Sequence, residues 1–294
     1  METILLFGST GWIGEKLAKI MLNRGYHVIP AKSRLDDPYS LNKELRETNF
    51  DYCFLSAGIT RDPKNPATNI DWCEDHINTT VNINYYGCLH LLKICKELNK
   101  KVIYLGTGCI YEYTEEHSVS SLKEGNIWKG YTEEDKPNFD KSIYSYSKIL
   151  FEDKAKEYDN ILILRLRMPI DSFLSPRNII TKLLKYEKII NIPNSMSVLD
   201  DLLPLIPDML HLNGIYNFTN PGVISHNELL DLYIKYIDNE FRYQNFSLEK
   251  QSKVIKAPRS NTALDCSKLL ALFPDIIPDI KVSVEEVMKR IKIH

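Results

Sequence analysis

The feature that most constrains this 294-residue chain is a glycine-rich turn directly after its first apolar run. Residues 3–7 are almost continuously apolar, and Gly8, Gly11 and Gly14 follow at a spacing of three. An amphipathic pattern led by Leu17 comes next, with the period of a helix. Because glycine permits a tight turn, this order predicts a strand, a turn and a helix, which is the first unit of a parallel α/β sheet.

Further short apolar runs alternate with helical patterns through the N-terminal half. Their residues are 27–31, 51–56, 101–106 and 161–166. Such nearly continuous apolar runs are typical of strands that are buried on both faces. We therefore predict an α/β fold, a Rossmann-type doubly wound parallel sheet with right-handed crossovers.

The strand–helix rhythm loosens after residue 166, where prolines separate shorter elements. We predict a Rossmann domain over 1–166, to which 214–219 returns as another core strand. Residues 167–213 and 220–294 are then a smaller, interleaved substrate-binding lobe. The polar, turn-rich segment 112–140 is expected to be a loop over the site.

Charge and cysteine usage exclude several classes of protein. The formal net charge is −2, which does not favour nucleic acid or an anionic membrane as a partner. The six cysteines form no C-x-x-C pair and none has a histidine at zinc spacing, so we expect reduced thiols and no metal. The first apolar run ends at a glycine and no apolar stretch is long enough to span a membrane, so we expect a cytoplasmic protein.

The position of the glycine turn indicates a dinucleotide. Gly8, Gly11 and Gly14 let the backbone approach a pyrophosphate closely, and the helix N-terminus presents free N–H groups to it. Thr10, Trp12 and Ile13 lie between these glycines and are expected to contact the same cofactor. A glycine-rich turn without a ligand is the alternative, but its place between the first strand and the first helix favours a cofactor.

The end of the second strand indicates which dinucleotide is bound. Lys32 and Arg34 stand there in place of the acid that usually binds the ribose of NAD, and basic side chains suit a 2′-phosphate. We therefore predict NADPH, with NADH as the less favoured cofactor; the alternative is that both basic residues lie on a solvated loop. Ala57 and Gly58, after the third strand, fit a small shelf against the dinucleotide or a simple turn.

Tyr144 and Lys148 stand four residues apart, so they share one face of a helix. A neighbouring ammonium lowers the pKa of a tyrosine, and the pair can give a proton to a carbonyl oxygen while hydride reaches its carbon. Thr107 closes the fourth strand and can bind the same oxygen. Tyr144 and Lys148 are also expected to contact the cofactor. A surface pair and a strand-end cap are the plain alternatives.

These residues resemble the set of the extended short-chain dehydrogenase/reductase family. Longer stretches resemble one subgroup, the bifunctional 3,5-epimerase/4-reductases of UDP-L-rhamnose synthesis. The stretches that carry this resemblance are Thr10-Gly11-Trp12-Ile13-Gly14, Asp71-Trp72-Cys73-Glu74, Thr107-Gly108-Cys109-Ile110-Tyr111-Glu112-Tyr113, Arg167-Met168-Pro169-Ile170, Pro176-Arg177-Asn178, Ile192-Pro193-Asn194-Ser195-Met196, Asn217-Phe218-Thr219-Asn220-Pro221-Gly222 and Ala257-Pro258-Arg259-Ser260-Asn261.

The resemblance implies an enzyme that epimerises UDP-4-keto-6-deoxy-D-glucose at C3 and C5 and reduces the C4 ketone with NADPH to give UDP-L-rhamnose. Both epimerised carbons are α to the ketone, so the groups that polarise its oxygen for reduction also stabilise an enolate. By resemblance, Cys109 and Lys182 are the acid–base residues of epimerisation. Taken alone, a strand-end cysteine is more often a packing residue, and a helical lysine is usually a solvated charge.

The resemblance also implies residues for the substrate. Arg259 would pair with the diphosphate, for which a guanidinium fork is well shaped. Asn178 and Asn194 would contact sugar or uracil, although either suits a turn or a helix cap. Asn84 resembles the asparagine that the family places near the active site, and its plain alternative is an amide on a helix surface.

Two other functions stay open at this point. One is a reductase without epimerase activity that acts on a UDP- or dTDP-4-keto sugar, which would not need Cys109 or Lys182. The other is a non-catalytic NADP-binding regulatory subunit, although such relatives typically lose the tyrosine or the lysine. A 4,6-dehydratase must act upstream as the pathway partner, and a homodimer is compatible with the family. The sequence leaves open whether the nucleotide is UDP or dTDP.

Overall fold

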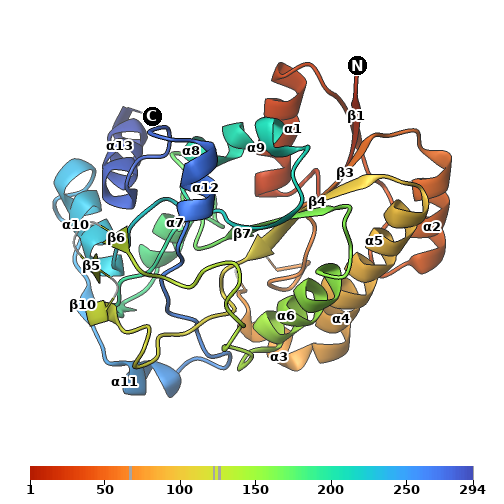
Figure 1. The fold of residues 1–294 in the computed structure, drawn as a ribbon. Coiled ribbons are helices and arrows are strands. Elements are labelled where there is room, and N and C mark those ends of the chain that lie inside the picture. Colours follow the sequence, from red (N-terminus) through yellow and green to blue (C-terminus); the bar gives the residue numbers. More distant parts are fainter. Residues whose placement is uncertain (66–67, 122, 125–126, 294) are drawn as a thin grey trace. The chain divides into compact units, whose positions relative to one another are not determined.

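The computed structural model describes residues 1–65, 68–121, 123–124 and 127–293 (Figure 1). Within these ranges, six strands form the main sheet in the order β2-β1-β3-β4-β7-β9. They are β1 (Thr3–Phe7), β2 (His27–Pro30), β3 (Tyr52–Leu55), β4 (Lys101–Thr107), β7 (Ile161–Leu166) and β9 (Gly214–Asn217). The pairs β1–β2, β1–β3 and β3–β4 are parallel, and the predicted α/β, doubly wound sheet is confirmed.

The order of the strands fixes where a ligand can bind. The chain moves from β1 outward to β2 in one direction and from β3 to β4 in the other, so the order reverses between β1 and β3. In such sheets the loops at the carboxyl ends of the two strands diverge and leave a crevice. The glycine turn after β1 and the segment after β3 are the two sides of that point.

The chain divides into two compact units. Unit 1 contains residues 1–110, 140–164 and 203–215, and unit 2 contains 111–139, 165–202 and 216–294. The helical segments of unit 1 are α1 (Trp12–Asn23), α2 (Pro38–Glu47), α3 (Asp71–Asp75), α4 (Ile77–Val81), the π-helical η1 (Asn82–Gly87), α5 (Cys88–Glu97), α6 (Ile143–Ala155), the 3₁₀ segment η3 (Leu203–Leu205) and α9 (Ile206–Met209).

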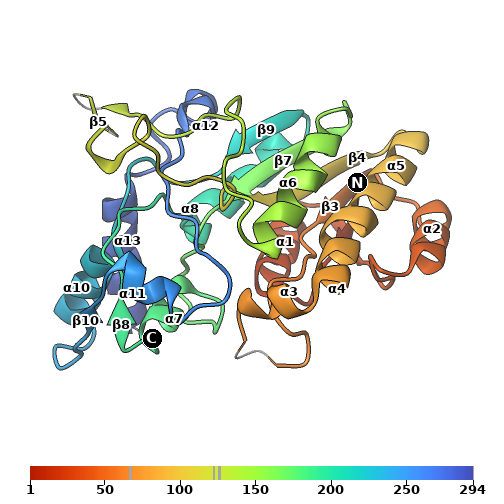
Figure 2. The same cartoon turned by 90° about the horizontal axis from the view of Figure 1, so that it is seen from below.

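Helices cover both faces of the sheet in unit 1. Helices α1 and α9 lie on one face, and α2, α4, α5 and α6 lie on the other, where the view from below shows them side by side (Figures 1 and 2). The strands supply the buried apolar side chains between these layers; β7 is buried along its whole length. Strand β2 is partly exposed because it is the edge of the sheet.

Unit 2 has its own apolar core between α7, α10 and α13, with Ile180, Leu229 and Val284 among its buried side chains. Its helical segments are η2 (Val119–Ser121), α7 (Ile179–Leu183), α8 (Leu199–Leu202), α10 (His226–Tyr236), α11 (Leu248–Ser252), α12 (Ser267–Leu272) and α13 (Ile280–Ile293). Its short strand pairs are β5 (Lys123–Glu124) with β6 (Ile127–Trp128) and β8 (Lys188–Ile189) with β10 (Gln244–Asn245).

The two units do not follow the division expected from the sequence. Residues 203–215 belong to unit 1, where the guanidinium of Arg24 at the end of α1 pairs with Asp208 at 2.8 Å. Residues 111–139 belong to unit 2 and contain η2, β5 and β6, so this segment is not a structureless loop. Its expected place over the site stays a prediction. Among the helices of the described residues, none is long and apolar enough to cross a membrane.

Candidate active site

The glycine turn has the geometry that a pyrophosphate requires. Gly8 has φ +82°, and a Cβ there would lie 2.8 Å from the backbone nitrogen of Ala57. A Cβ on Gly14 would lie 2.0 Å from the carbonyl oxygen of Gly8, so the first turn of α1 packs directly on the loop. Gly11 caps α1 without a side-chain hydrogen bond, so no capping side chain takes the place of an anion at the start of the helix. The turn therefore fits the pyrophosphate of a dinucleotide.

The basic residues after β2 are exposed and are held by acids. The guanidinium of Arg34 makes two hydrogen bonds to the carboxylate of Asp36, at 2.8 and 2.9 Å. The carboxylate of Glu44 on α2 accepts hydrogen bonds from the backbone N–H groups of Lys32 and Ser33, both at 2.7 Å. The segment is thus fixed by α2, while the side chains of Lys32 and Arg34 keep their positive charges at the surface.

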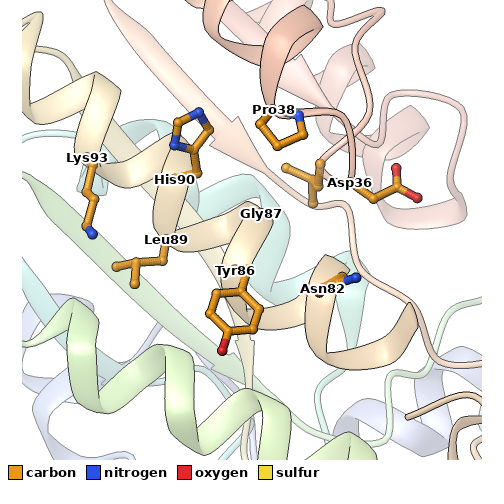
Figure 3. Close-up of a pocket in the computed structure, with 9 residues that line it drawn as sticks. Asp36, Pro38, Asn82, Tyr86, Gly87, Leu89, His90 and Lys93 are labelled. Atoms are coloured by element: carbon orange, nitrogen blue, oxygen red, sulfur yellow. The ribbon is translucent and has the colours of Figure 1, made fainter. Parts of the chain in front are cut away.

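A pocket of about 400 Å³ lies beside this segment. Figure 3 shows Asp36 and Pro38 on one side of it and the side chains of Tyr86, His90 and Lys93 on η1 and α5. Gly87 also lines it and packs closely on this segment, because a Cβ there would lie 2.2 Å from the carbonyl oxygen of Leu35. The segment after β2 is therefore held from two helices, α2 and η1–α5.

The catalytic residues predicted in unit 1 lie together. Thr107 ends β4, and its hydroxyl accepts a hydrogen bond from the backbone N–H of Cys109 at 3.1 Å. Tyr144 is half-buried next to this strand end, where its phenol hydrogen-bonds with Thr107 and has the Cys109 thiol as a neighbour. The ammonium of Lys148 lies 6.0 Å from the centre of the Tyr144 ring. The structure thus brings Thr107, Cys109, Tyr144 and Lys148 into one cluster.

The electrostatics of this cluster differ from the sequence-based expectation. Lys148 was expected to lower the pKa of Tyr144, but burial, followed by the neighbouring Cys109 thiol, raises that pKa, and the hydrogen bond with Thr107 opposes the rise only in part. Lys148 is 6% exposed, and burial lowers its own pKa. Its ammonium donates to the hydroxyl of Tyr104 at 2.7 Å rather than to Tyr144. The phenol of Tyr144 is therefore protonated at neutral pH in this structure, as a proton donor must be.

The start of α6 is fastened to β4 and α3. The Ser142 hydroxyl caps the helix by accepting from the N–H of Ser145, and Glu74 on α3 accepts from the N–H of Ile143 at 2.9 Å. The Ser145 hydroxyl donates to the carbonyl oxygen of Cys109 at 2.6 Å. These bonds fix the start of α6, and with it Tyr144, against the end of β4. Lys148 follows Tyr144 by four residues.

Asn84 is fully buried and has an organising role. Its side-chain oxygen accepts from the N–H of Ile59 at 2.8 Å, and its nitrogen donates to the Ile59 carbonyl and to the Ser147 hydroxyl. It links the segment after β3 to α6. A Cβ on Gly58 would lie 3.4 Å from both the Asn84 oxygen and the Lys148 nitrogen, so Gly58 lies beside Lys148. Contact of Ala57 and Gly58 with a dinucleotide stays a prediction.

Asn178 and Asn194 are buried in unit 2 and engaged in internal bonds. Asn178 caps α7 and donates to the carbonyls of Asp171 and Phe173. The oxygen of Asn194 accepts from the guanidinium of Arg167 at 2.5 Å, and its nitrogen also has protein partners. Contact of these amides with sugar or uracil stays a prediction, against which their internal bonds count.

The other two predicted residues of unit 2 are more accessible. Lys182 is exposed on α7, and Arg259 is half-buried, with its guanidinium bonded to the carbonyl of Ala257. Ala257 and Ser260 are buried, whereas Pro258 between them is exposed and Arg259 is half-buried.

Sequence reasoning missed three residues that organise the cluster: Tyr104, Ser145 and Glu74. Tyr104 looks like an ordinary apolar strand residue, and no local pattern distinguishes a phenol that binds a lysine from one that packs. Ser145 lies within the Tyr144–Lys148 motif, where its position next to the tyrosine was a usable signal. Glu74 lies in the stretch Asp71-Trp72-Cys73-Glu74, and the residue that it binds, Ile143, is 69 residues away in the chain.

Comparison with known proteins places this geometry in a family. Residues 4–167 match the model of the NAD dependent epimerase/dehydratase family. The chain is 45% identical over 276 residues to a bifunctional dTDP-4-dehydrorhamnose 3,5-epimerase/dTDP-4-dehydrorhamnose reductase of Arabidopsis thaliana, covering 93% of this chain and 88% of that one. It is 47% identical, over the same share of this chain, to a trifunctional UDP-glucose 4,6-dehydratase/UDP-4-keto-6-deoxy-D-glucose 3,5-epimerase/UDP-4-keto-L-rhamnose-reductase of that plant, of which it spans 40%.

A solved structure is similar over the whole chain. The UDP-rhamnose synthase of Acanthamoeba polyphaga mimivirus is 39% identical, with a TM-score of 0.90, and the match covers 98% of this chain and 99% of that one. The glycine turn and the Tyr144–Lys148 pair are consistent with the family that these matches indicate. The chain belongs to the NAD-dependent epimerase/dehydratase family.

Proposed function

We propose that this protein converts UDP-4-keto-6-deoxy-D-glucose to UDP-L-rhamnose by epimerisation at C3 and C5 and reduction at C4 with NADPH. The observation that carries the proposal is the single cluster of Thr107, Cys109, Tyr144 and Lys148. It combines the groups for proton donation to a ketone with a thiol next to them. The names of the two plant relatives support the same pair of activities, and the name of the viral synthase supports UDP-rhamnose as the product.

One cluster can serve both half-reactions because they share the ketone oxygen. Removal of a proton from C3 or C5 leaves an enolate whose negative charge develops on the C4 oxygen, and hydride addition at C4 develops charge on the same atom. The protonated phenol of Tyr144 and the Thr107 hydroxyl are the donors that this oxygen requires. In the reduction, Tyr144 gives its proton to the oxygen, and the Lys148 ammonium stabilises the phenolate that remains.

Epimerisation needs a base on one face of each carbon and an acid on the other. We assign one role to Cys109, whose position beside Tyr144 lets a thiol act on a carbon next to the ketone. We assign the other to Lys182, an exposed amine on α7. The proton removed from one face by the base is replaced on the opposite face by the acid, so the configuration inverts and no net proton is consumed.

The residues that would hold NADPH are those of the glycine turn and the end of β2. The pyrophosphate would lie at Gly8, Gly11 and the start of α1, and Lys32 with Arg34 would bind the 2′-phosphate. When bound, this cofactor supplies the hydride that reaches C4. We place the diphosphate of the substrate at Arg259, and a 4,6-dehydratase must supply the keto sugar.

The deciding experiment is an assay of the purified protein with UDP-4-keto-6-deoxy-D-glucose and NADPH, repeated with the dTDP sugar and with NADH. We expect UDP-L-rhamnose as the product, with NADPH preferred. Consumption of the pre-epimerised ketone alone would leave only a reductase. Turnover of no keto sugar by any combination would contradict the proposal and favour a regulatory, cofactor-binding subunit.

Lys182 can be tested against a lysine on the same segment. Lys182→Ala should reduce deuterium incorporation at C3 or C5 from heavy water, while Lys185→Ala, which also removes an exposed amine from this segment, should not. Equal incorporation in the two variants would remove Lys182 from the mechanism.

A further inference from the structure

The Lys148 ammonium has an unusual partner. Its nitrogen donates a hydrogen bond of 2.7 Å to the hydroxyl of Tyr104 on β4 and lies 4.8 Å from the centre of that ring, closer than the 6.0 Å to the Tyr144 ring. Within the described part of the chain, no carboxylate forms an ion pair with it. A buried charge is costly unless it is hydrogen-bonded, so the phenol of Tyr104 is the group that makes burial of this ammonium tolerable.

The Tyr104 side chain is held in a fixed position by burial and ring packing. It is 1% exposed, and its ring packs on Phe151 of α6 with the ring centres 4.5 Å apart. Burial, followed by the nearby Cys88 thiol, the Tyr144 phenol and the Glu152 carboxylate, raises the pKa of Tyr104 well above its usual range. The hydroxyl therefore stays neutral, and it accepts the hydrogen bond through a lone pair without pairing the lysine as an anion would.

The other groups around Lys148 are weaker partners. From α5, the Cys88 thiol faces it, but that thiol donates to the Ile83 carbonyl, and burial raises its pKa to about 11, so it is neutral. From α6, Glu152 favours the charged lysine at longer range. On the side of the segment after β3, Gly58 lies close to the nitrogen, since a Cβ there would be 3.4 Å from it.

We propose that Tyr104 is a positioning residue of the reductive site, whose neutral hydroxyl holds the Lys148 ammonium charged beside Tyr144. A carboxylate in that place would neutralise the ammonium and cancel its attraction for the phenolate that forms when Tyr144 gives up its proton. A neutral acceptor fixes the lysine and leaves its positive charge available. The kinetic part of this inference rests on the proposed function, and the structural part does not.

The test is Tyr104→Phe, which keeps the ring on Phe151 and removes only the acceptor. The titration of Lys148 can be followed through its ¹³Cε signal in lysine-labelled protein and assigned with Lys148→Arg. We expect its midpoint to fall by about one pH unit, since a hydrogen bond to a charged group contributes roughly that much. The alkaline limb of the kcat profile should move down with it, so that kcat on that limb falls by about tenfold with little change in KM.

Two controls separate positioning from packing. Tyr52→Phe removes a phenol hydroxyl from the neighbouring strand β3, where it bonds to Glu2, and should leave the midpoint unchanged. Phe151→Leu loosens the ring contact but keeps the hydroxyl, so it should lower stability without moving the midpoint. If Tyr104→Phe does not fold, Tyr104→Met, a flexible apolar filler, should show the same lowered midpoint.

An unchanged Lys148 midpoint in the acceptor-free variant would overturn the role of Tyr104. If the wild-type protein reduces no keto sugar, the proposed function fails while the titration still decides the role of Tyr104. A lowered midpoint with an unmoved kcat limb would show that the lysine charge is not used in the reduction, which would also overturn the inference.

Discussion

Cys109 and Tyr144 are linked by hydrogen bonds of backbone and hydroxyl groups near them. The N–H of Cys109 donates to Thr107, and its carbonyl accepts from Ser145, the residue after the tyrosine. The thiol proposed for epimerisation and the phenol proposed for reduction are therefore fixed by one short network. A change at either end of this network should affect the two half-reactions differently.

The thiol itself gives the first prediction. Cys109→Ala should abolish deuterium incorporation at C3 or C5 from heavy water, because it removes one of the two groups that exchange the proton. Reduction of the pre-epimerised 4-keto sugar should persist within about tenfold, since Thr107, Tyr144 and Lys148 remain. Product analysis by NMR in heavy water measures both, and unchanged incorporation would remove Cys109 from the mechanism.

Ser145→Ala tests the link between the two groups. It removes the bond to the Cys109 carbonyl, worth about 1 kcal/mol, and the acceptor of the Ser142 hydroxyl, while the Ser142 oxygen still caps α6 by accepting from the N–H at position 145. Deuterium incorporation should fall several-fold more than reduction, because the thiol loses its fixed position. Ser120→Ala, an exposed hydroxyl in unit 2, is the control. An equal loss of both activities would mean that Ser145 only stabilises the fold.

What the sequence could predict at this scale depends on distance along the chain. Tyr144 and Lys148 are four residues apart, so helix geometry alone joins them, and Thr107 is placed by the strand end. The partner of Lys148 is 44 residues away in β4, and it depends on how α6 packs on the sheet. The effect of burial on Tyr144 was mispredicted for the same reason, because the depth of a side chain is a property of the packed fold.

At the scale of elements, the π-helical segment η1 separates α4 from α5. A π turn inserts one residue into the helical ladder and is often found at functional sites. Here it carries the buried Asn84, which binds the segment after β3, and it ends at Gly87 against the segment after β2. One irregular turn thus contacts the segments that follow β2 and β3, the two strands on either side of β1. The sequence pattern does not predict this π-helical segment.

Gly87→Ala should be destabilising. Its Cβ would lie 2.2 Å from the carbonyl oxygen of Leu35, which is backbone and cannot rotate away. Overpacking of this kind costs about 1–3 kcal/mol, which a urea denaturation curve resolves. Tyr86→Ala, at the neighbouring exposed position, should change stability by less than about 0.5 kcal/mol. A free energy of unfolding equal to that of the wild type would show that the segment after β2 is not held by this contact.

The strands were predicted closely because each is a short apolar run ended by a turn residue. Strands β1 and β7 coincide with their predicted ranges, and the others differ by one or two residues at their ends. The units were harder to place. Residues 203–215 return to unit 1 through the packing of α9 and η3 beside α1, a long-range contact that proline spacing does not encode.

At the scale of the whole molecule, stability should depend on pH through a buried histidine. Burial, and next the nearby Arg167, lower the pKa of His226 at the start of α10 to about 4. The folded state keeps His226 neutral while the unfolded chain takes up a proton below about pH 6.5, so stability is full above that pH and is lost as the pH falls toward 4. At pH 5 the loss from this group is about 2 kcal/mol.

Replacement of the imidazole isolates this contribution. His226→Leu should be less sensitive to acid than the wild type, so the difference in unfolding free energy between the two should move in favour of the variant by about 2 kcal/mol between pH 7 and pH 5. Urea denaturation at both pH values measures it. His211→Leu, which removes an exposed imidazole, is the matched control, and its unfolding free energy should follow that of the wild type at both pH values. Parallel curves for His226→Leu and wild type would contradict the assignment.

Cofactor choice is also a property of the whole molecule, because a ligand that binds only the folded state stabilises it by RT ln(1 + [L]/Kd). The ion pair of Arg34 with Asp36 is largely exposed, so it is weak and a 2′-phosphate can displace it. NADPH should therefore raise the melting temperature more than NADH at equal concentration.

Arg34→Ala should lose about 2 kcal/mol of that extra stabilisation, the value of one charge-assisted contact, and respond equally to both dinucleotides. Arg46→Ala, which breaks another exposed ion pair of unit 1, should keep the NADPH preference. If Arg34→Ala still prefers NADPH to the same degree, the 2′-phosphate is bound elsewhere, and the exposed charge of this arginine serves only the surface.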